Sequence, residues 1–289
     1  MDFKNAQELL ALCEKHQLPI SEIMRQREVI VGESTFESVD SQMKRVLEIM
    51  KDAAFSPIKS PVKSMGGLIG GEAQKLSRHI ASGRGICGDV LEKAITYAMA
   101  TLETNASMGL IVASPTAGSA GIVPGLLLAL REVYHFSDKE TEKVLFNAGA
   151  IGYLAMRNAT VAGAVGGCQA ETGVAAAMAA SAATELMGGT PLQCTYAAST
   201  VLMNMLGLVC DPVGGLVEYP CQNRNASGVS IALVAAEMAL AGITQFIPLD
   251  EMITIIYTVG RKLPAELRET ALGGCAAAPS ACKACHMCE

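Results

Sequence analysis

VLEKAITYAMATLETNASMG (90–109), SPTAGSAGIVPG (114–125) and LLLALREVYHF (126–136) follow one another as a helical pattern, a stretch rich in glycine and proline, and a second helical pattern. The middle stretch interrupts apolar segments, and loops of that kind tend to line a site. The same order continues downstream and predicts an all-α fold. Further helices are expected at about 138–158, 170–187, 190–208, 228–242 and 248–260.

Composition favours closely packed helices. The 289 residues are 51% hydrophobic but only 4% aromatic, with no Trp and 15 Met, whereas strands prefer β-branched and aromatic residues. This length is close to the upper limit for a single core. We therefore expect a peripheral N-terminal helical layer (1–55), one helical domain (56–274) and a Cys-rich tail (275–289). The two Ser-Pro steps in FSPIKSPVKS (55–64) predict a linker.

Charge and hydropathy narrow the class of partner. The net charge of −6 and the scattered lysines and arginines argue against nucleic acid and favour a small-molecule substrate. Two stretches without charge, 105–130 and 186–210, are broken by Gly, Pro and polar residues, so buried core elements are expected and membrane spans are not. The N-terminus lacks a secretory signal pattern, which predicts a cytoplasmic protein.

The chain has ten cysteines, and a reducing compartment disfavours disulfides, so a clustered subset suggests metal ligation or redox chemistry. Cys13, Cys87 and Cys194 occur in ordinary helical contexts and are expected to be inert buried thiols. A buried inert thiol is also the alternative for each remaining cysteine taken alone.

Three internal cysteines lie in Gly- or Pro-containing contexts: Cys168 in GGCQ, Cys210 in VCDPVGG and Cys221 in YPCQNRN. Each is expected to project from a backbone turn. Cysteines on loops in an apolar core can converge on an iron-sulfur cluster, which needs thiolate ligands and nearby backbone NH groups. Their spacing matches no compact ligand pattern, so three separate buried thiols stay open as an alternative.

Four long blocks, in order, resemble the alpha subunit of the iron-sulfur-dependent L-serine dehydratases, and the likeness covers nearly the whole chain. The blocks are NASMGLIVASPTAGSAGIVPG (105–125), GAVGGCQAETG (163–173), NMLGLVCDPVGGLVEYPCQNRNASG (204–228) and LPAELRETALGG (263–274).

The resemblance implies a helical catalytic domain at 56–274 and a [4Fe-4S] cluster held by Cys168, Cys210 and Cys221. One iron of that cluster would stay open. It also implies a role in amino-acid degradation and gluconeogenesis, and a beta-subunit partner, because the family's separate α/β domain is missing from this sequence. Gly/Pro-rich loops are then expected to converge on the cluster.

The resemblance further implies the chemistry. An open iron acts as a Lewis acid on the hydroxyl of L-serine while a base takes the Cα proton. The aminoacrylate product tautomerises and hydrolyses to pyruvate and ammonia without pyridoxal phosphate. Two alternatives stay open: an L-cysteine desulfidase-type iron-sulfur lyase, and a non-catalytic electron-transfer or scaffold protein with an iron-sulfur or zinc site.

The loop SPTAGSAG predicts the site of the substrate carboxylate, because backbone NH groups and hydroxyls in a tight turn before a helix attract anions. Its candidate residues are Ser114, Thr116, Gly118 and Ser119; the alternative is that small residues here only let helices pack. Asn225 is a further candidate for substrate binding.

Lys75 is the candidate base, since a buried lysine can accept a proton. The alternative is a solvated helix lysine, and Glu72 and His79 are weaker candidates one helical turn away. Asp211 and Arg224 are expected to support the neighbouring cysteines structurally, as is Asn225 if it does not reach the substrate.

The tail CKACHMC (282–288) repeats the C-x2-C step of bacterial ferredoxins, without their fourth cysteine and proline. Cys282, Cys285 or Cys288 could cap the open iron or deliver a cluster. Zinc binding together with Cys275 or His286, or a disordered end, are the alternatives.

Overall fold

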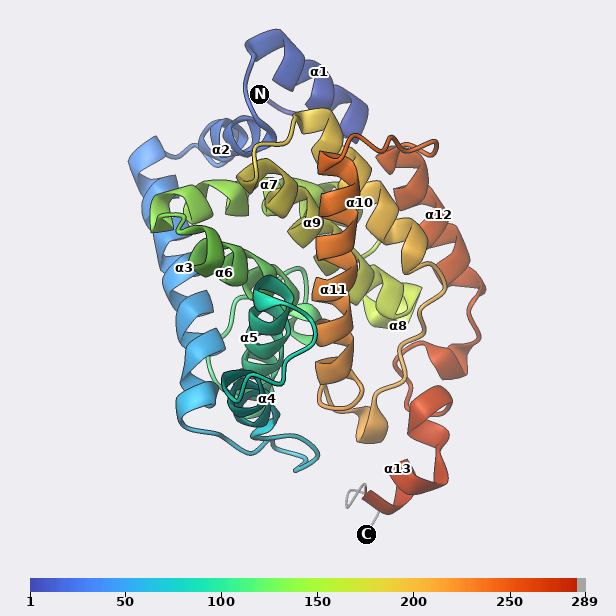
Figure 1. Ribbon diagram of the computed structural model, residues 1–289. Helices are drawn as coiled ribbons and strands as arrows, with labels where there is room; N and C mark the ends of the chain where they lie inside the picture. Colours follow the sequence, from blue (N-terminus) through green and yellow to red (C-terminus); the bar gives the residue numbers. More distant parts are fainter. Residues whose placement is uncertain (285–289) are drawn as a thin grey trace.

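The computed structural model describes residues 1–284, and every regular element in that range is a helix (Figure 1). The only extended pairing among the described residues is an isolated bridge between Cys210 and Arg268. The predicted all-α class is confirmed. No helix among the described residues has the length and apolar character needed to cross a bilayer.

The N-terminal layer consists of α1 (Ala6–His16), α2 (Ile20–Val31) and α3 (Phe36–Lys59). Asn5 caps α1 by accepting the Glu8 amide, and α3 packs along the central helix α5 (Asp89–Ala106). Polar caps start these helices because the first amides of a helix have no intrahelical partner.

The predicted linker at 55–64 is wrong at its beginning, because α3 continues through Pro57 to Lys59. A proline inside a helix leaves the carbonyl four residues earlier without its amide donor. That carbonyl belongs to Ala53, and Thr104 Oγ1 on α5 donates to it at 2.8 Å. A neighbouring helix therefore supplies the missing hydrogen bond, which local sequence could not indicate. The division of the chain into three parts stays a prediction.

The core lies where four helices, α6, α7, α10 and α11, meet around α9 (Val174–Leu186), whose side chains are buried from Val174 to Thr184. The neighbours of α9 are α6 (Ile122–Tyr134), α7 (Asp138–Asn158), α10 (Pro191–Asn204) and α11 (Cys221–Leu240). The remaining helices are α12 (Leu249–Lys262) and the shorter α4 (Glu72–Ala81), α8 (Gly163–Gly166) and α13 (Pro279–Ala284). The expected helices in this region are therefore present, although α11 begins seven residues earlier than the sequence pattern suggested.

The glycines of the opening stretch permit close helix crossing. A Cβ atom on Gly121 would lie 2.3 Å from the Ala98 carbonyl oxygen, and one on Gly125 would lie 2.8 Å from that of Ala94. Helices α5 and α6 can therefore approach to backbone contact only with glycine at these positions. This contact fixes the position of the 114–121 loop that leads into α6.

Candidate metal centre

The three internal cysteines come together in the described structure. Cys168 precedes a π-helical turn (Gln169–Gly173), Cys210 follows α10 in the bridge with Arg268, and Cys221 is the first residue of α11. All three are buried and free of disulfides. The expectation that each projects from a turn is wrong for Cys168 and Cys221, which begin helical segments, where the amides favour thiolates.

The pKa values of the thiols depend on one another. A hydrogen bond from Cys210, helped by Thr172, lowers the pKa of the Cys168 thiol although burial opposes it. Donation to Cys168 and burial both raise the pKa of Cys210. Burial and the nearby charges of Cys168 and Glu171 raise the pKa of Cys221 to about 12. Geometry agrees for two of them: Cys168 Sγ lies 2.8 Å from Thr172 Oγ1, and Cys210 Sγ lies 3.6 Å from Glu171 Oε2 in the same π-helical turn. The effect of the Cys168 charge on Cys221 indicates that Cys221 lies near them.

The donor set fits a [4Fe-4S] cluster. Three free thiols converge, and Arg224 places a cation beside them: burial would lower its pKa, but the charges of Cys168 and Asp211 raise it. A cation offsets part of the negative charge of buried thiolates. Gly163 leaves room beside the site, since a Cβ atom there would lie 3.1 Å from Cys210 Sγ.

Glu171 is a site residue that the sequence reasoning missed. Its Oε1 accepts the Thr116 hydroxyl at 2.8 Å, and its Oε2 lies 3.6 Å from Cys210 Sγ. Burial raises the pKa of this carboxyl, and the hydrogen bond from Thr116 only partly opposes that effect. One signal could have found it: Glu171 is the only charged residue between Arg157 and Glu185. An isolated acid in an apolar stretch is costly unless it has a partner or a function.

Glu171 also lies in a group with metal-binding chemistry. One ligand atom each from Glu171, Cys210 and the exposed Glu269 lies within 4.8 Å of the others. The π-helical turn explains this position, because such turns re-aim side chains and occur often at functional sites.

The predicted substrate loop lies beside this group. Thr116 connects it to Glu171, and a Cβ atom on Gly118 would lie 3.7 Å from Glu171 Oε1. Thr116 and Ser119 cap a short 3-10 helix, Ala117–Ser119. The Ser114 hydroxyl is buried and has no hydrogen-bond partner among the described residues. An unpaired buried hydroxyl is costly, so it marks a place where a polar ligand would be stabilised.

Asn225, the further candidate for substrate binding, uses its polar atoms for hydrogen bonds within the protein. Its amide nitrogen donates to the carbonyl oxygens of Gly118 at 2.8 Å and Cys221 at 2.9 Å, and its Oδ1 accepts the Gly121 amide at 3.0 Å. The side chain is fully buried, and both amide hydrogens are used. Asn225 therefore joins the substrate loop to the start of α11 and has the structural role named as its alternative.

Lys75 does not have the environment that its predicted role required. Its side chain on α4 is 76% exposed, and its Nζ lies 3.4 Å from Glu72 Oε1. The burial on which the base assignment depended is missing, so the solvated lysine describes it better. His79 lies on the same helix and is exposed as well. Cys87 is also exposed, in the loop before α5, whereas Cys13 and Cys194 are buried as expected.

Asp211 joins the cysteine loop to the C-terminal segment. Its carboxylate pairs with Arg224 at 2.7 Å and accepts the Cys275 amide at 2.6 Å. The predicted supporting role of Asp211 and Arg224 therefore has a geometric basis. Cys282 is exposed, and its Sγ lies 3.9 Å from the Ala276 carbonyl oxygen. Cys285 and Cys288 lie outside the described residues, so the tail hypotheses stay predictions.

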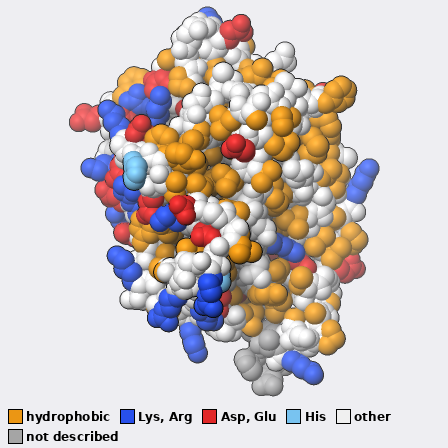
Figure 2. All heavy atoms as spheres, viewed as in Figure 1, with side chains coloured by type: hydrophobic (Ala, Val, Ile, Leu, Met, Phe, Trp, Pro, Cys, Tyr) orange, Lys and Arg blue, Asp and Glu red, His pale blue; other side chains and the backbone are white. Residues whose placement is uncertain are grey.

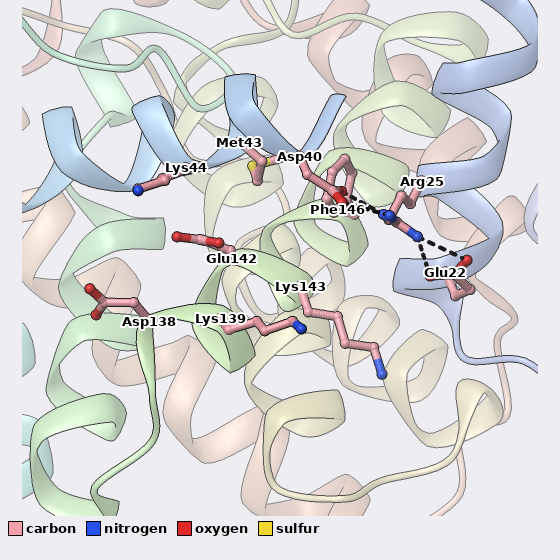
Figure 3. A pocket seen from close by; sticks show the side chains of 10 residues that line it. All are labelled: Glu22, Arg25, Asp40, Met43, Lys44, Asp138, Lys139, Glu142, Lys143 and Phe146. Carbon is pink, nitrogen blue, oxygen red and sulfur yellow. Dashed lines mark hydrogen bonds and ion pairs between the residues drawn. The ribbon is translucent and has the colours of Figure 1, made fainter. Parts of the chain in front are cut away.

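A cavity of about 650 Å³ lies between the N-terminal layer and α7, and its lining includes none of the three internal cysteines (Figure 3). Its lining is strongly charged, and Arg25 pairs there with Asp40 at 2.6 Å and with Glu22 at 3.4 Å. Arg25 is thus paired with two carboxylates that line the same cavity. The cavity contains no cysteine, so it is not the candidate metal centre.

Comparison with known proteins identifies the family of this chain. A family model described as "Serine dehydratase alpha chain" matches residues 15–276. The "Probable L-serine dehydratase, alpha chain" of Bacillus subtilis is 48% identical over 278 residues, which are 96% of this chain and 92% of the relative. The "L-serine dehydratase, alpha chain" of Peptoniphilus asaccharolyticus is 41% identical over 94% of this chain and 93% of its own length.

A longer relative is the "L-serine dehydratase" of Helicobacter pylori (strain ATCC 700392 / 26695), which is 36% identical over 95% of this chain but only 61% of its own length. The residues that the family model matches, 15–276, include the three internal cysteines, the 114–119 loop and Glu171. The chain belongs to the serine dehydratase alpha chain family.

Proposed function

We propose that this chain is the catalytic subunit of an L-serine dehydratase that converts L-serine to pyruvate and ammonia. We further propose that Cys168, Cys210 and Cys221 hold a [4Fe-4S] cluster. The observation that carries this proposal is that Cys168 and Cys210, two buried free thiols, both contact the Glu171–Thr172 turn, with the buried Cys221 nearby and the unpaired buried Ser114 hydroxyl in the adjoining loop. A cytoplasmic, reducing setting suits thiols that must stay reduced.

The cluster, when bound, would supply a Lewis-acidic iron for the leaving hydroxyl of the substrate. The protein itself has to bind and orient the amino acid. We assign the carboxylate of L-serine to the 114–119 loop, where the Ser114 hydroxyl lacks a partner among the described residues. Thr116 and Ser119 hold the shape of this loop through their cap. Binding here places the amino acid next to Cys210 and Glu171.

We assign the movement of the Cα proton to Glu171, in place of Lys75. The Glu171 carboxyl adjoins both the substrate loop and Cys210, and Thr116 orients it through a hydrogen bond. Burial raises its pKa, and a carboxylate with a raised pKa is a stronger proton acceptor. Once it has taken the proton at Oε2, the protonated carboxyl is the form that burial favours.

We also propose that a beta chain completes the enzyme. Relatives that are called alpha chains match this chain over nearly their whole length, whereas the Helicobacter pylori enzyme has a further part outside the match. A second polypeptide would supply that part.

The test is anaerobic reconstitution with iron and sulfide, in the presence of the beta chain. The expected result is formation of pyruvate from L-serine, faster than from L-cysteine, and a spectral change of the cluster when L-serine is added. Faster turnover of L-cysteine would favour the desulfidase alternative. Truncation after Ala281 should leave the iron bound; loss of all iron would favour a scaffold that binds metal through its tail.

A further inference from the structure

Glu218 is a buried carboxylate in the segment that joins Cys210 to Cys221. On the face of the molecule shown in Figure 2, Lys, Arg, Asp and Glu side chains gather mainly over the N-terminal layer at the left, where water can solvate them. Glu218, in contrast, is only 2% exposed. A charge that leaves water is costly unless other groups replace its hydration. The groups that surround Glu218 therefore have to donate hydrogen bonds to it.

These donors all come from one segment without helix, residues 64–70 between α3 and α4, which we call the clamp segment. The Ser64 hydroxyl donates to Glu218 Oε2 at 2.6 Å. The amides of Gly66 and Leu68 donate to its Oε1 and Oε2 at 2.6 and 3.0 Å. Gly66 permits this approach, since a Cβ atom there would lie 2.9 Å from Glu218 Oε1. Hydrogen bonds to a charged acceptor are the strong ones, so Glu218 holds the clamp segment firmly.

The turn that carries Glu218 also lies against the substrate loop. A hydrogen bond from the Val213 amide to the Tyr219 carbonyl oxygen, at 2.9 Å, closes this turn. Within it, Val217 adjoins the substrate loop, because a Cβ atom on Gly118 would lie 3.4 Å from Val217 Cγ1. The turn 213–219 is therefore in contact with the clamp segment and with the substrate loop.

Cys221 follows directly after this turn. The Glu218 carbonyl oxygen accepts the Gln222 amide at 3.0 Å, so Glu218 and Cys221 belong to the same turn at the start of α11. On the other side of Cys221, Gln222 Nε2 donates to Glu103 Oε1 on α5 at 3.2 Å. The same oxygen accepts the Ala73 amide at the start of α4, at 2.9 Å. The clamp segment and α5 thus hold the chain immediately before and after Cys221.

We infer that Glu218 is a positioning residue for the metal centre: its carboxylate holds the turn before α11 so that the Cys221 thiol stays near those of Cys168 and Cys210. The inference rests on the proposed function, because that proposal makes Cys221 a cluster ligand. Glu218 acts through the backbone and the clamp segment. Groups that orient the ligands of a metal typically contribute about 10- to 100-fold to metal affinity.

Two variants break the same contact from its two ends. Glu218→Gln keeps the size of the side chain, but its amide group turns a donor toward the donors of the clamp segment. Ser64→Ala removes one of those donors and leaves Glu218 unchanged. The control is Glu92→Gln, because Glu92 is 8% exposed and also holds a loop, by accepting the Cys87 amide at 3.2 Å.

The first measurement uses the full-length chain without a cluster, kept anaerobic and treated with iodoacetamide. A buried thiol reacts only when the structure around it opens, so the alkylation rate reports how firmly Cys221 is held. Mass spectrometry of peptides compares Cys221 with Cys194 in each variant. Glu218→Gln should raise the rate at Cys221 at least about tenfold and leave Cys194 unchanged. Ser64→Ala should cause a smaller rise at Cys221, and Glu92→Gln none.

The second measurement is the rate at which the anaerobically reconstituted protein loses iron to a chelator. Glu218→Gln should lose iron about 10- to 100-fold faster than the wild type, and the electron paramagnetic resonance spectrum of its reduced cluster should change. Unchanged iron loss would overturn the inference, as would an unchanged alkylation rate at Cys221 in both clamp variants. An equal rise at Cys221 and Cys194 would also overturn it, because that pattern indicates a general loss of stability.

The two proposals can fail separately. A selective effect of Glu218→Gln on Cys221, in a chain whose wild type binds no iron after reconstitution, would refute the proposed function and retain the role of Glu218 in placing the thiol. A wild type that binds iron and turns over L-serine, with a Glu218→Gln variant that matches it in alkylation and iron loss, would refute the role of Glu218 alone.

Discussion

Two ion pairs of nearly equal length lie in very different surroundings. Arg25 and Asp40 pair at 2.6 Å in the N-terminal layer, where their side chains are 24% and 49% exposed. Arg224 and Asp211 pair at 2.7 Å beside the cysteines, where the values are 16% and 2%. The first pair lines the charged cavity of about 650 Å³, and the second adjoins the candidate metal centre. The volume and the charge of a cavity therefore do not identify the candidate site in this protein. The burial of charged and polar side chains beside the cysteines does.

The largest effect is expected from a change to the cysteines. Cys210→Ser should lower L-serine turnover at least about 1,000-fold, because both a ligand and the iron that depends on it are lost. Iron and sulfide analysis of the anaerobically reconstituted protein measures the cause directly. Cys194→Ala is the matched control, since Cys194 is equally buried but lies away from the site. A Cys210→Ser protein with a full complement of iron would refute the ligand assignment.

Glu171→Gln is expected to lower turnover by about 100- to 10,000-fold while the iron stays bound, because the amide keeps the shape but cannot accept a proton. The control is Glu142→Gln on α7, in the charged cavity beside the N-terminal layer, where burial also raises the carboxyl pKa. Steady-state rates and iron content are measured together. Similar turnover rates for the two variants would show that Glu171 does not take part in the proton transfer.

The two ion pairs can be compared directly through stability. Asp211→Asn should lower the free energy of unfolding by about 3–5 kcal/mol, because it leaves Arg224 buried without its counter-charge. Asp40→Asn should lower it by at most about 1 kcal/mol, since water screens that pair. Denaturant titration of the cluster-free proteins gives both values. Equal losses would contradict the view that burial distinguishes the two regions.

A pH effect is expected from Glu103, which is fully buried under the start of α4. Burial raises its pKa, and the charge of Glu72 adds to this, against hydrogen bonds that include the Ala73 amide. The folded state thus binds the proton more tightly than the unfolded state. Its contribution to stability is present below the unfolded pKa of about 4.3 and is lost as the pH rises through the folded pKa.

Glu103→Gln has no proton to lose. The free energy of unfolding of the wild type should therefore fall more steeply than that of Glu103→Gln as the pH rises from about 4 to about 8. Denaturant titrations at several pH values test this. Parallel pH profiles would mean that Glu103 does not contribute to the pH dependence of stability.

The smallest effect is expected from Lys75→Met. The Lys75 side chain is largely exposed, and an exposed ion pair contributes little to stability. Turnover of L-serine should therefore change less than about twofold, and the free energy of unfolding by less than about 0.5 kcal/mol. Kinetics of the complete enzyme measure the first. A loss of turnover approaching that of Glu171→Gln would restore Lys75 as the base.

Much of the fold could be predicted because its signals are local. The expected helix at 138–158 coincides with α7, whose start is marked by the reciprocal cap of Ser137 and Glu140. The break at 114–125 was visible as glycine and proline, and Gly121 and Gly125 do allow the close crossing of α5 and α6. The three ligand positions came from resemblance, whereas their spacing in the chain had matched no compact pattern.

The errors have a common origin in contacts between distant segments. Pro57 suggested a linker, yet Thr104 satisfies the carbonyl that the proline leaves free. Asn225 has the chemistry of a substrate ligand, but the loop around Gly118 and Gly121 already occupies its polar atoms. Glu171 was overlooked because its proximity to Thr116 depends on how the π-helical turn packs.

By itself, the order of residues determined that this protein is helical and where its apolar segments break, since caps, glycines and hydrophobic patterns act over a few residues. Only the tertiary structure decided which polar groups are free to meet a ligand. That depends on desolvation and on partners far away in the chain, so Asn225 is used up, Lys75 faces water, and Glu171 lies beside the thiols.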